Sequence, residues 1–106
     1  MAKFLITGSY TAEGATALLK EGGSRRKAAV EQMLSGMDGR VEAFYFAFGD
    51  SDVYVIVDVP DTISGAALSL AVNASGSVKL STIMLMTPEE VDAACKKTVR
   101  YRAPGQ

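Results

Sequence analysis

Apolar residues along this chain recur with two spacings, every second residue in some stretches and every third or fourth residue in others. The first spacing, together with many β-branched and aromatic residues, predicts strands. These strand-like stretches are residues 3–9, 40–48, 51–59 and 77–86. The second spacing predicts helices. The helical stretches are residues 11–20, a segment from Ser24 that ends at Met37-Asp38-Gly39, residues 61–75 and residues 87–97.

The stretch from Gly49 to Asp61 carries the clearest local signals. Gly49-Asp50 is a tight acidic turn between two runs of β-branched or aromatic residues, which is a strong hairpin signal. Pro60 then ends the second strand of the hairpin, and Asp61 can cap the helix that follows. This stretch therefore fixes the middle of the fold.

Glycines and capping residues mark the ends of the helices. Gly22 and Gly23 separate the first two helical stretches, and we expect Ser24 to restart the helix as its N-cap. Thr87-Pro88-Glu89-Glu90 is a capping box with proline at the first helical position. The helix over residues 61–75 has the best amphipathic pattern, so we expect it to bury one apolar row. That row is Ile63, Ala66, Ala67, Leu70, Ala71 and Ala74.

The order of elements, β-α-β-β-α-β with a C-terminal helix, predicts an α+β fold of the ferredoxin-like kind. A length of 106 residues is close to the commonest size of a single domain. We expect one domain over residues 1–97 and an irregular tail over residues 98–106.

Both sides of the predicted sheet are rich in apolar residues. Alternate positions of two neighbouring strands form the rows Phe44, Phe46 and Phe48, and Val53, Val55, Val57 and Val59. Helices in this topology cover one face of the sheet, and a solvated second face ought to be polar. Because monomers avoid large exposed apolar patches, we expect the second face to be buried against another copy of the chain. The prediction is a homodimer, or a higher oligomer, formed through the sheet face.

Composition and charge exclude several classes of protein. Histidine is absent, which excludes Ser-His and Cys-His nucleophile systems, histidine metal sites and an axial haem histidine. A net charge of −1 gives no sign of nucleic-acid binding. No apolar run is long enough for a signal peptide or a membrane span. We expect a cytoplasmic protein without a metal or cofactor, whose single cysteine, Cys95, is a half-buried packing residue.

Short motifs in a fixed order run from residue 3 to residue 91. They are Thr7-x-x-Tyr10-Thr11, Gly14, an arginine at 25 or 26, Gly39, Pro60-Asp61, Gly76-Ser77-Val78, Ser81-Thr82 and Thr87-Pro88-Glu89-Glu90. In this order they resemble the small GYD-domain proteins. The turn that names that family reads Gly-x-Tyr-Asp, and this chain has Gly49-Asp50-Ser51-Asp52, with serine in place of the tyrosine. The resemblance implies a dimeric α/β-barrel fold and brings no established activity.

A ligand site is expected between the first helical segment and the sheet, where an apolar space would meet a few polar groups. The candidate residues are Thr7, Tyr10, Arg25, Arg26, Asp52, Tyr54 and Thr82. We hypothesise an anionic or polar aromatic small molecule, with its negative group toward the arginine. The alternative is that these residues close the edge of the sheet and satisfy one another.

Asp58 stands inside a valine-rich strand, where a charged residue is costly unless it is paired. The expected explanations are a salt bridge to Lys79 on the same sheet or exposure at the strand end beside Pro60. The alternative is an acid that faces a ligand.

Two classes of function remain open. The first is a non-catalytic, homo-oligomeric module for small-molecule binding or assembly, similar to the effector-binding half of feast/famine-type regulators without their DNA-binding segment. The second is a small cofactor-independent enzyme of the monooxygenase or isomerase type. Acid–base work in such an enzyme would fall to Tyr45, Tyr54, Asp58 or an arginine.

Overall fold

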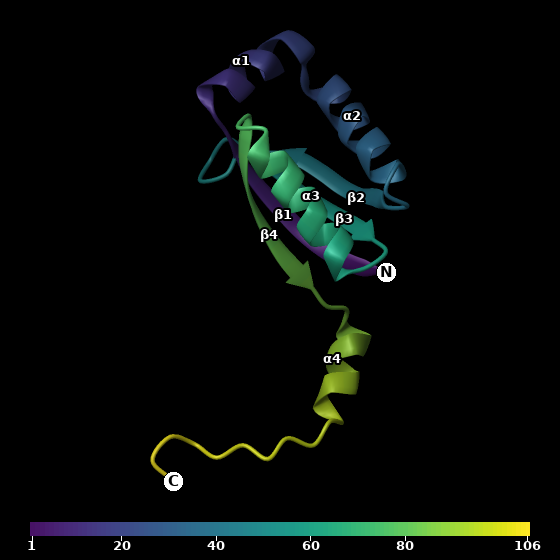
Figure 1. The fold of residues 1–106 in the computed structure, drawn as a ribbon, viewed down its shortest axis with the longest axis vertical. Coiled ribbons are helices and arrows are strands. Elements are labelled where there is room, and N and C mark those ends of the chain that lie inside the picture. The colour runs from purple at the N-terminus through teal and green to yellow at the C-terminus, as the bar shows by residue number, and fades with distance from the viewer.

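Four antiparallel strands in the order β2-β3-β1-β4 form one sheet at the centre of the molecule. The computed structural model describes all residues from 1 to 106. Its elements are β1 (Ala2–Tyr10), α1 (Ala12–Glu21), α2 (Gly23–Ser35), β2 (Arg40–Phe46), β3 (Val53–Val59), α3 (Thr62–Ala74), β4 (Val78–Leu85) and α4 (Pro88–Cys95). This is the predicted α+β, ferredoxin-like fold, with an interrupted first helix (Figure 1).

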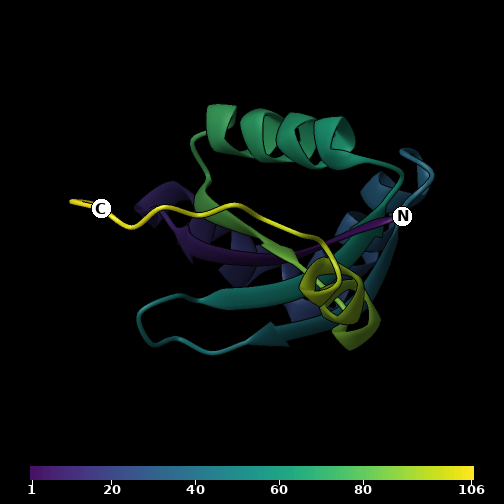
Figure 2. The same cartoon turned by 90° about the horizontal axis from the view of Figure 1, so that it is seen from below.

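One face of the sheet carries the core and lies under the helices. Phe4 and Ile6 of β1 sit opposite Val57 and Val55 of β3, and these side chains are buried. Phe44 of β2 also sits opposite Val55, so the phenylalanine row and the valine row share this face. Leu34 of α2 and Leu68 of α3 complete the buried cluster. We call this the helix-covered face; Figure 2 shows α3 lying over the sheet.

The opposite face of the sheet, which we call the open face, carries no helix and consists of three cross-strand rows. The charged row is Arg40, Asp58 and Lys3, with the apolar Leu85 at its β4 end. The apolar row is Ala43, Ile56, Leu5 and Ile83. The hydroxyl row is Tyr45, Tyr54, Thr7 and Ser81. Ile83 is 48% exposed and Tyr45 is 71% exposed. An apolar strip with polar rows on both sides is therefore accessible on the open face.

Asp58 in the charged row is paired, but the expected partner was wrong. Its carboxylate lies 2.9 Å from the Lys3 ammonium and 3.0 Å from the Arg40 guanidinium. Lys79 sits opposite Ser9, at the other end of β1, because the strand register places it there. Hydrogen bonds to Glu42 and Asp58 raise the pKa of Lys3 above its ordinary value of 10.5. The buried acid is thus part of an ion-pair cluster at one end of the sheet.

The joint between α1 and α2 differs from the predicted one. Gly22 has φ of 83° and serves both as the C-cap of α1 and as the N-cap of α2, which has no side-chain cap. Ser24 lies inside α2, so its predicted capping role is wrong. Only glycine takes this left-handed conformation at little cost, and the chain needs it to change direction between two adjoining helices.

The predicted buried row of α3 is also wrong. Gly65 and Leu68 face the sheet, while Ile63 and Leu70 are 80% and 72% exposed. A Cβ atom at residue 65 would lie 2.5 Å from the ring of Phe4. The helix can come this close to the sheet only with its glycine facing inward, and that contact sets its rotation.

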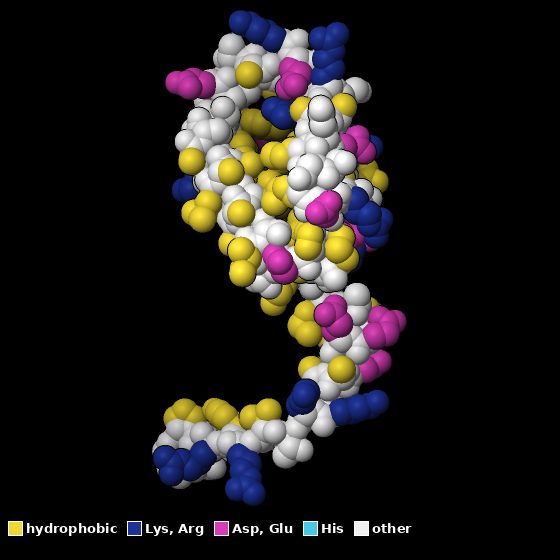
Figure 3. All heavy atoms as spheres, turned by 45° about the vertical axis from the view of Figure 1, so that its right-hand side comes forward, with side chains coloured by type: hydrophobic (Ala, Val, Ile, Leu, Met, Phe, Trp, Pro, Cys, Tyr) yellow, Lys and Arg dark blue, Asp and Glu magenta, His cyan; other side chains and the backbone are white.

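The C-terminal arm, residues 87–106, stands away from the sheet and the other helices (Figures 1 and 3). The predicted capping box at its start is confirmed: Thr87 accepts from the Glu90 N–H, and the Glu90 side chain accepts from the Thr87 N–H. No residue of α4 is buried. Cys95 is exposed, so its predicted half-buried position is wrong; its helix has nothing to pack against. No helix in the structure has the length and apolar character needed to cross a bilayer.

Candidate functional site

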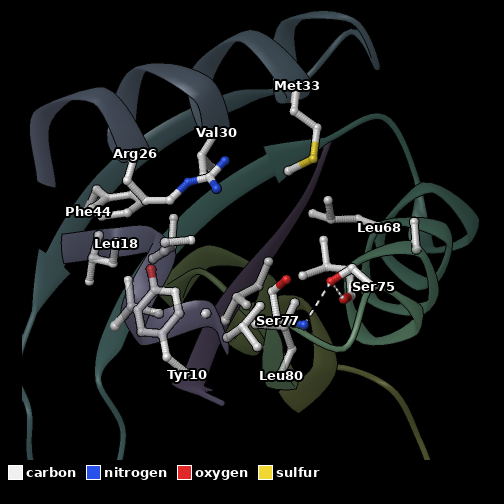
Figure 4. Close-up of a pocket in the computed structure, with 18 of the residues that line it drawn as sticks. Tyr10, Leu18, Arg26, Val30, Met33, Phe44, Leu68, Ser75, Ser77 and Leu80 are labelled. Atoms are coloured by element: carbon white, nitrogen blue, oxygen red, sulfur yellow. Dashed lines mark hydrogen bonds between the residues drawn. The ribbon is translucent and has the colours of Figure 1, made fainter. Parts of the chain in front are cut away.

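A cavity of about 410 Å³ lies between the helix-covered face of the sheet and helices α1, α2 and α3. Of the 21 residues that line it, 16 are hydrophobic. Its walls include Leu18 of α1, Val30 and Met33 of α2, and Leu68 of α3, while Phe44 and Leu80 belong to the sheet (Figure 4). Figure 3 shows hydrophobic side chains inside a hollow of the surface between the helices. The helices and the sheet therefore do not close on one another at this point.

Helix α1 is fastened over one end of the cavity by the connection between α3 and β4. The Thr11 N–H donates to the Ser77 carbonyl at 3.0 Å, and the Thr11 hydroxyl donates to the Gly76 carbonyl at 2.9 Å. The same hydroxyl accepts from the Gly14 N–H and caps the helix. A Cβ atom at Gly14 would clash with the Ser77 carbonyl oxygen. Glycine at this position thus permits α1 to reach the end of β4.

The two charged residues of the cavity, Arg26 and Glu21, lie at the junction of α1 and α2. Arg26 lines the cavity, and its Nη1 lies 3.6 Å from Oε2 of Glu21, the last residue of α1. Its Nε is buried without a hydrogen-bond partner. Figure 4 shows the Arg26 side chain extending over the cavity, with the Tyr10 hydroxyl on the side that faces it. A cation and a phenol thus share one end of an otherwise apolar space.

Tyr10 is a hydrogen-bond donor at neutral pH. Burial raises the pKa of its phenol above the ordinary value of 10.0, and the nearby positive charge of Arg26 acts in the opposite direction. The net shift is upward, so the hydroxyl keeps its proton at neutral pH. It can therefore donate to a bound acceptor.

The acidic turn positions Tyr10 without lining the cavity. The Asp52 carboxylate accepts from the Tyr10 backbone N–H at 2.8 Å, and the Asp52 N–H donates to the Gly8 carbonyl at 2.7 Å. These two bonds tie the β2–β3 connection to the end of β1. Ser51, which stands where the family signature has tyrosine, takes no part in either bond.

The structure brings together only some of the candidate residues predicted from the sequence. Tyr10 and Arg26 line the cavity, and Asp52 contacts the backbone of Tyr10. Thr82 is on the same side of the sheet, but its hydroxyl donates to the Ser69 hydroxyl at 3.2 Å. Arg25 is exposed and outside the lining.

Thr7 and Tyr54 are separated from these residues by the sheet itself. They sit opposite each other in the hydroxyl row of the open face. Binding by any of the candidates stays a prediction, but a single site in this cavity can include only those on the helix-covered side.

Sequence reasoning missed Glu21 and most of the apolar lining. In the sequence, Glu21 directly precedes the glycines that separate two helical stretches. Because the chain turns at these glycines, the Glu21 carboxylate reaches the Arg26 guanidinium five residues later. Val30, Met33 and Leu34 recur at helical spacing in the sequence, which is typical of an apolar stripe on one side of a helix. That stripe faces a cavity, which no sequence pattern could show.

The chemistry available in the cavity is limited to one guanidinium, one phenol, one carboxylate and the hydroxyls of Ser75 and Ser77. The structure contains no group of three or more His, Cys, Asp or Glu residues placed to hold a metal ion. Tyr45, Tyr54 and Asp58, the acid–base candidates of the enzyme alternative, all belong to the open face. The arrangement is suited to holding a molecule by its charge and shape.

Comparison with known proteins gives a family. The family model described as the GYD domain matches residues 4–95, which include β1 from Phe4 onward, the other three strands and the whole of α1 to α4. No curated protein and no solved structure matches the chain.

Proposed function

The chain belongs to the GYD domain family, and we propose that it is a homo-oligomeric protein that binds a small molecule in the cavity beneath α1, α2 and α3. The cavity is the observation that carries this proposal. Its volume of about 410 Å³ is within the range of ligand sites, and it combines an apolar lining with a few polar groups at one end. Protein interiors are close-packed, and unfilled apolar space lowers stability. A bound molecule would restore the lost contacts.

Binding is favoured over catalysis by the state of the ionisable groups in the cavity. The Tyr10 phenol, with its raised pKa, is not a base at neutral pH. Glu21 faces the Arg26 guanidinium at 3.6 Å, so its carboxylate is engaged by a cation of the same protein. An efficient general base has a pKa near the working pH, and burial moves the pKa of the Tyr10 phenol away from it.

Replacing either of two alanines of α3 with phenylalanine tests whether ligands bind in the cavity. Ala71 lines it and Ala74 does not, so Ala71→Phe fills the space while Ala74→Phe adds the same ring outside. In a thermal-shift screen of small metabolites, we expect compounds that raise the melting temperature of the wild type. A ligand at 100 times its Kd adds about 2.7 kcal/mol of stability. The shift should vanish in Ala71→Phe and remain in Ala74→Phe.

Two results would contradict cavity binding. One is a screen in which no compound raises the melting temperature. The other is a ligand whose effect survives in Ala71→Phe, because that ligand would occupy some other place on the protein.

We also propose that two copies of the chain pair through the open face. The apolar row Ala43, Ile56, Leu5 and Ile83 supports this, because a charged row and a hydroxyl row flank it on either side. An apolar centre with a polar rim is the usual anatomy of a protein interface. Two such sheets can pack face to face at about 10 Å.

The C-terminal arm gives further support to the proposed pairing. Helix α4 has eight residues, and isolated helices this short are only marginally stable in water. Its exposed Val91, together with Val99 and Tyr101 of the tail, has no apolar surface of its own chain to contact. A second copy would supply such a surface.

The pairing is tested by Ile83→Lys on the open face, with Leu70→Lys on the outer side of α3 as the control. Leu70 is the more exposed of the two, so the control changes more accessible apolar surface. Sedimentation at micromolar concentration should show a dimer for the wild type and for Leu70→Lys, and a single chain for Ile83→Lys. A wild-type protein that sediments as one chain would end this proposal.

A further inference from the structure

We infer that the ligand of the cavity is an amphipathic monoanion, such as a medium-chain carboxylate, whose anionic group replaces Glu21 on Arg26. This inference rests on the proposed function, because it names the class of molecule that the same cavity takes. It depends on three features: the unused donors of Arg26, the charges around it, and the size and apolar character of the remaining space.

Arg26 has hydrogen-bonding capacity that the protein leaves unused. Its nearest carboxylate oxygen, on Glu21, is 3.6 Å from Nη1, whereas a charge-assisted bond of this kind measures about 2.7–2.9 Å. Its Nε is buried and has no partner. A guanidinium presents five N–H donors in a planar fork that matches the two oxygens of a carboxylate. The Arg26 side chain can therefore donate hydrogen bonds to an anion that is better placed than the Glu21 carboxylate.

Glu21 is the group that such an anion would displace. It is the last residue of α1, and its side chain keeps about a third of its surface exposed (31%). A partly exposed carboxylate that gives up one long contact can turn into water at little cost, because ion pairs near the surface contribute little to stability. The exchange removes one carboxylate from the guanidinium and adds another, so the charge at the site is conserved.

The surroundings of Arg26 favour an anion over a neutral polar group. The first five residues of α2 include Arg25, Arg26 and Lys27, and its first turn holds no acidic residue. The N-terminal end of a helix is itself positive, so this turn combines two sources of positive potential. Of the three cations, only Arg26 lines the cavity, which limits the ligand to a single negative charge inside it.

The rest of the cavity selects an apolar body of moderate length. Met33 and Leu68 lie at the side of the cavity away from Tyr10 and Arg26 in Figure 4. At about 30 Å³ for each water-sized atom, 410 Å³ accommodates roughly a dozen non-hydrogen atoms. Decanoate has about that number. Its carboxylate would meet Arg26 and the Tyr10 hydroxyl, while its chain would run toward Met33, whose flexible side chain adapts to different shapes.

The test compares decanoate with decanamide, its neutral analogue, by isothermal titration calorimetry. On the wild type we expect decanoate to bind at least tenfold more tightly. Arg26→Gln should weaken decanoate by about 10–100-fold, as expected for a lost hydrogen bond to a charged group, and should leave decanamide nearly unchanged. Arg25→Gln, the matched change one residue away, removes a charge outside the lining, so it should weaken decanoate far less than Arg26→Gln does and should leave decanamide unchanged.

Glu21→Gln separates displacement from simple attraction, and it also provides a second variant if Arg26→Gln fails to fold. Removing the competing carboxylate should tighten decanoate binding several-fold, whereas a structural role for Glu21 would weaken it. Decanamide binding as tightly as decanoate, or weaker decanoate binding to Glu21→Gln, would overturn the inference. If decanoate does not bind but a neutral compound does, and Ala71→Phe abolishes that binding, the ligand class is wrong and cavity binding stands. If nothing binds, both fail.

Discussion

The two faces of the sheet are formed by the same strands and differ in what covers them. In β3, Val53, Val55, Val57 and Val59 are all buried on the helix-covered face. On the open face of the same strand, Tyr54 is exposed and Ile56 is partly so. The helix-covered face has its partner within the chain and still encloses an empty space. The open face has no helix over it, and the cavity described above lies on the other side of the sheet. A small molecule therefore suits the first face, and a flat surface suits the second.

The comparison also separates two reasons for an apolar surface. Phenylalanine and valine rows look alike in the sequence, and the register places both on the side that the helices cover. The apolar strip on the open face is made instead of scattered residues from all four strands, such as Leu5 and Ile83. The side with the stronger apolar pattern is thus covered by the protein's own helices, and the proposed pairing concerns the other side.

Leu34→Ala should lower the free energy of unfolding more than the other substitutions, because it removes a fully buried side chain from the core under the helices. Leu34 is 0% exposed, and such a truncation in a core costs about 2–5 kcal/mol. The loss should be the same at every protein concentration, as measured by urea unfolding. Leu19→Ala, at an 86% exposed position of α1, is the control and should stay within about 0.5 kcal/mol of the wild type. Equal losses in the two variants would mean that α2 does not close the core.

Asp58→Asn should have an intermediate effect and acts on the open face. It leaves Lys3 and Arg40 without their shared carboxylate. Breaking a fully buried ion pair costs about 3–5 kcal/mol, but the two cations here reach solvent, so we expect about 1–2 kcal/mol. Asp50→Asn in the exposed turn is the matched control. High salt should narrow the difference between wild type and Asp58→Asn; no dependence on salt would indicate that packing, not charge, holds Asp58 there.

Asp61→Asn should change stability the least, and the size of the change should depend on pH. The backbone N–H of Ser64 donates to its carboxylate at 2.7 Å and lowers the pKa of that carboxyl below 3.8. A lowered pKa in the folded state means stabilisation that is present above pH 3.8 and is lost as the pH falls through the folded-state pKa. Asp61→Asn keeps a capping side chain without the charge, so its melting temperature should fall less steeply in acid. Parallel acid profiles for the two proteins would contradict this.

Local patterns sufficed to predict the elements and most of their caps. The Asp61 cap and the Thr87–Glu90 capping box depend on residues three apart, and both are present. The buried side of α3 was not predictable in this way, because it depends on Gly65 fitting over Phe4, 61 positions earlier in the chain. The partners of Asp58 depend on register in the same way.

The candidate site was predicted in part for a related reason. Tyr10 ends β1 and Arg26 lies in the first turn of α2, with only the ten-residue α1 between those elements, so they are close in the chain. Thr7 and Tyr54 were misjudged as neighbours of the site because side chains on a strand alternate between faces, so one residue decides the side. Glu21 was overlooked because its contact with Arg26 forms only when Gly22 turns the chain.

The glycine joint at residue 22 has a kinetic consequence. Two walls of the cavity come from helices on either side of this joint: α1 is fixed to Ser77 through Thr11, while α2 continues from Gly22 without a side-chain cap. A few residues that absorb backbone rotation are enough to let one element swing against another. For the ligand proposed above, the residence time would then be set by the glycine joint, and the affinity would be set by the residues that line the cavity. Two relatives with the same lining could hold the same molecule for very different times.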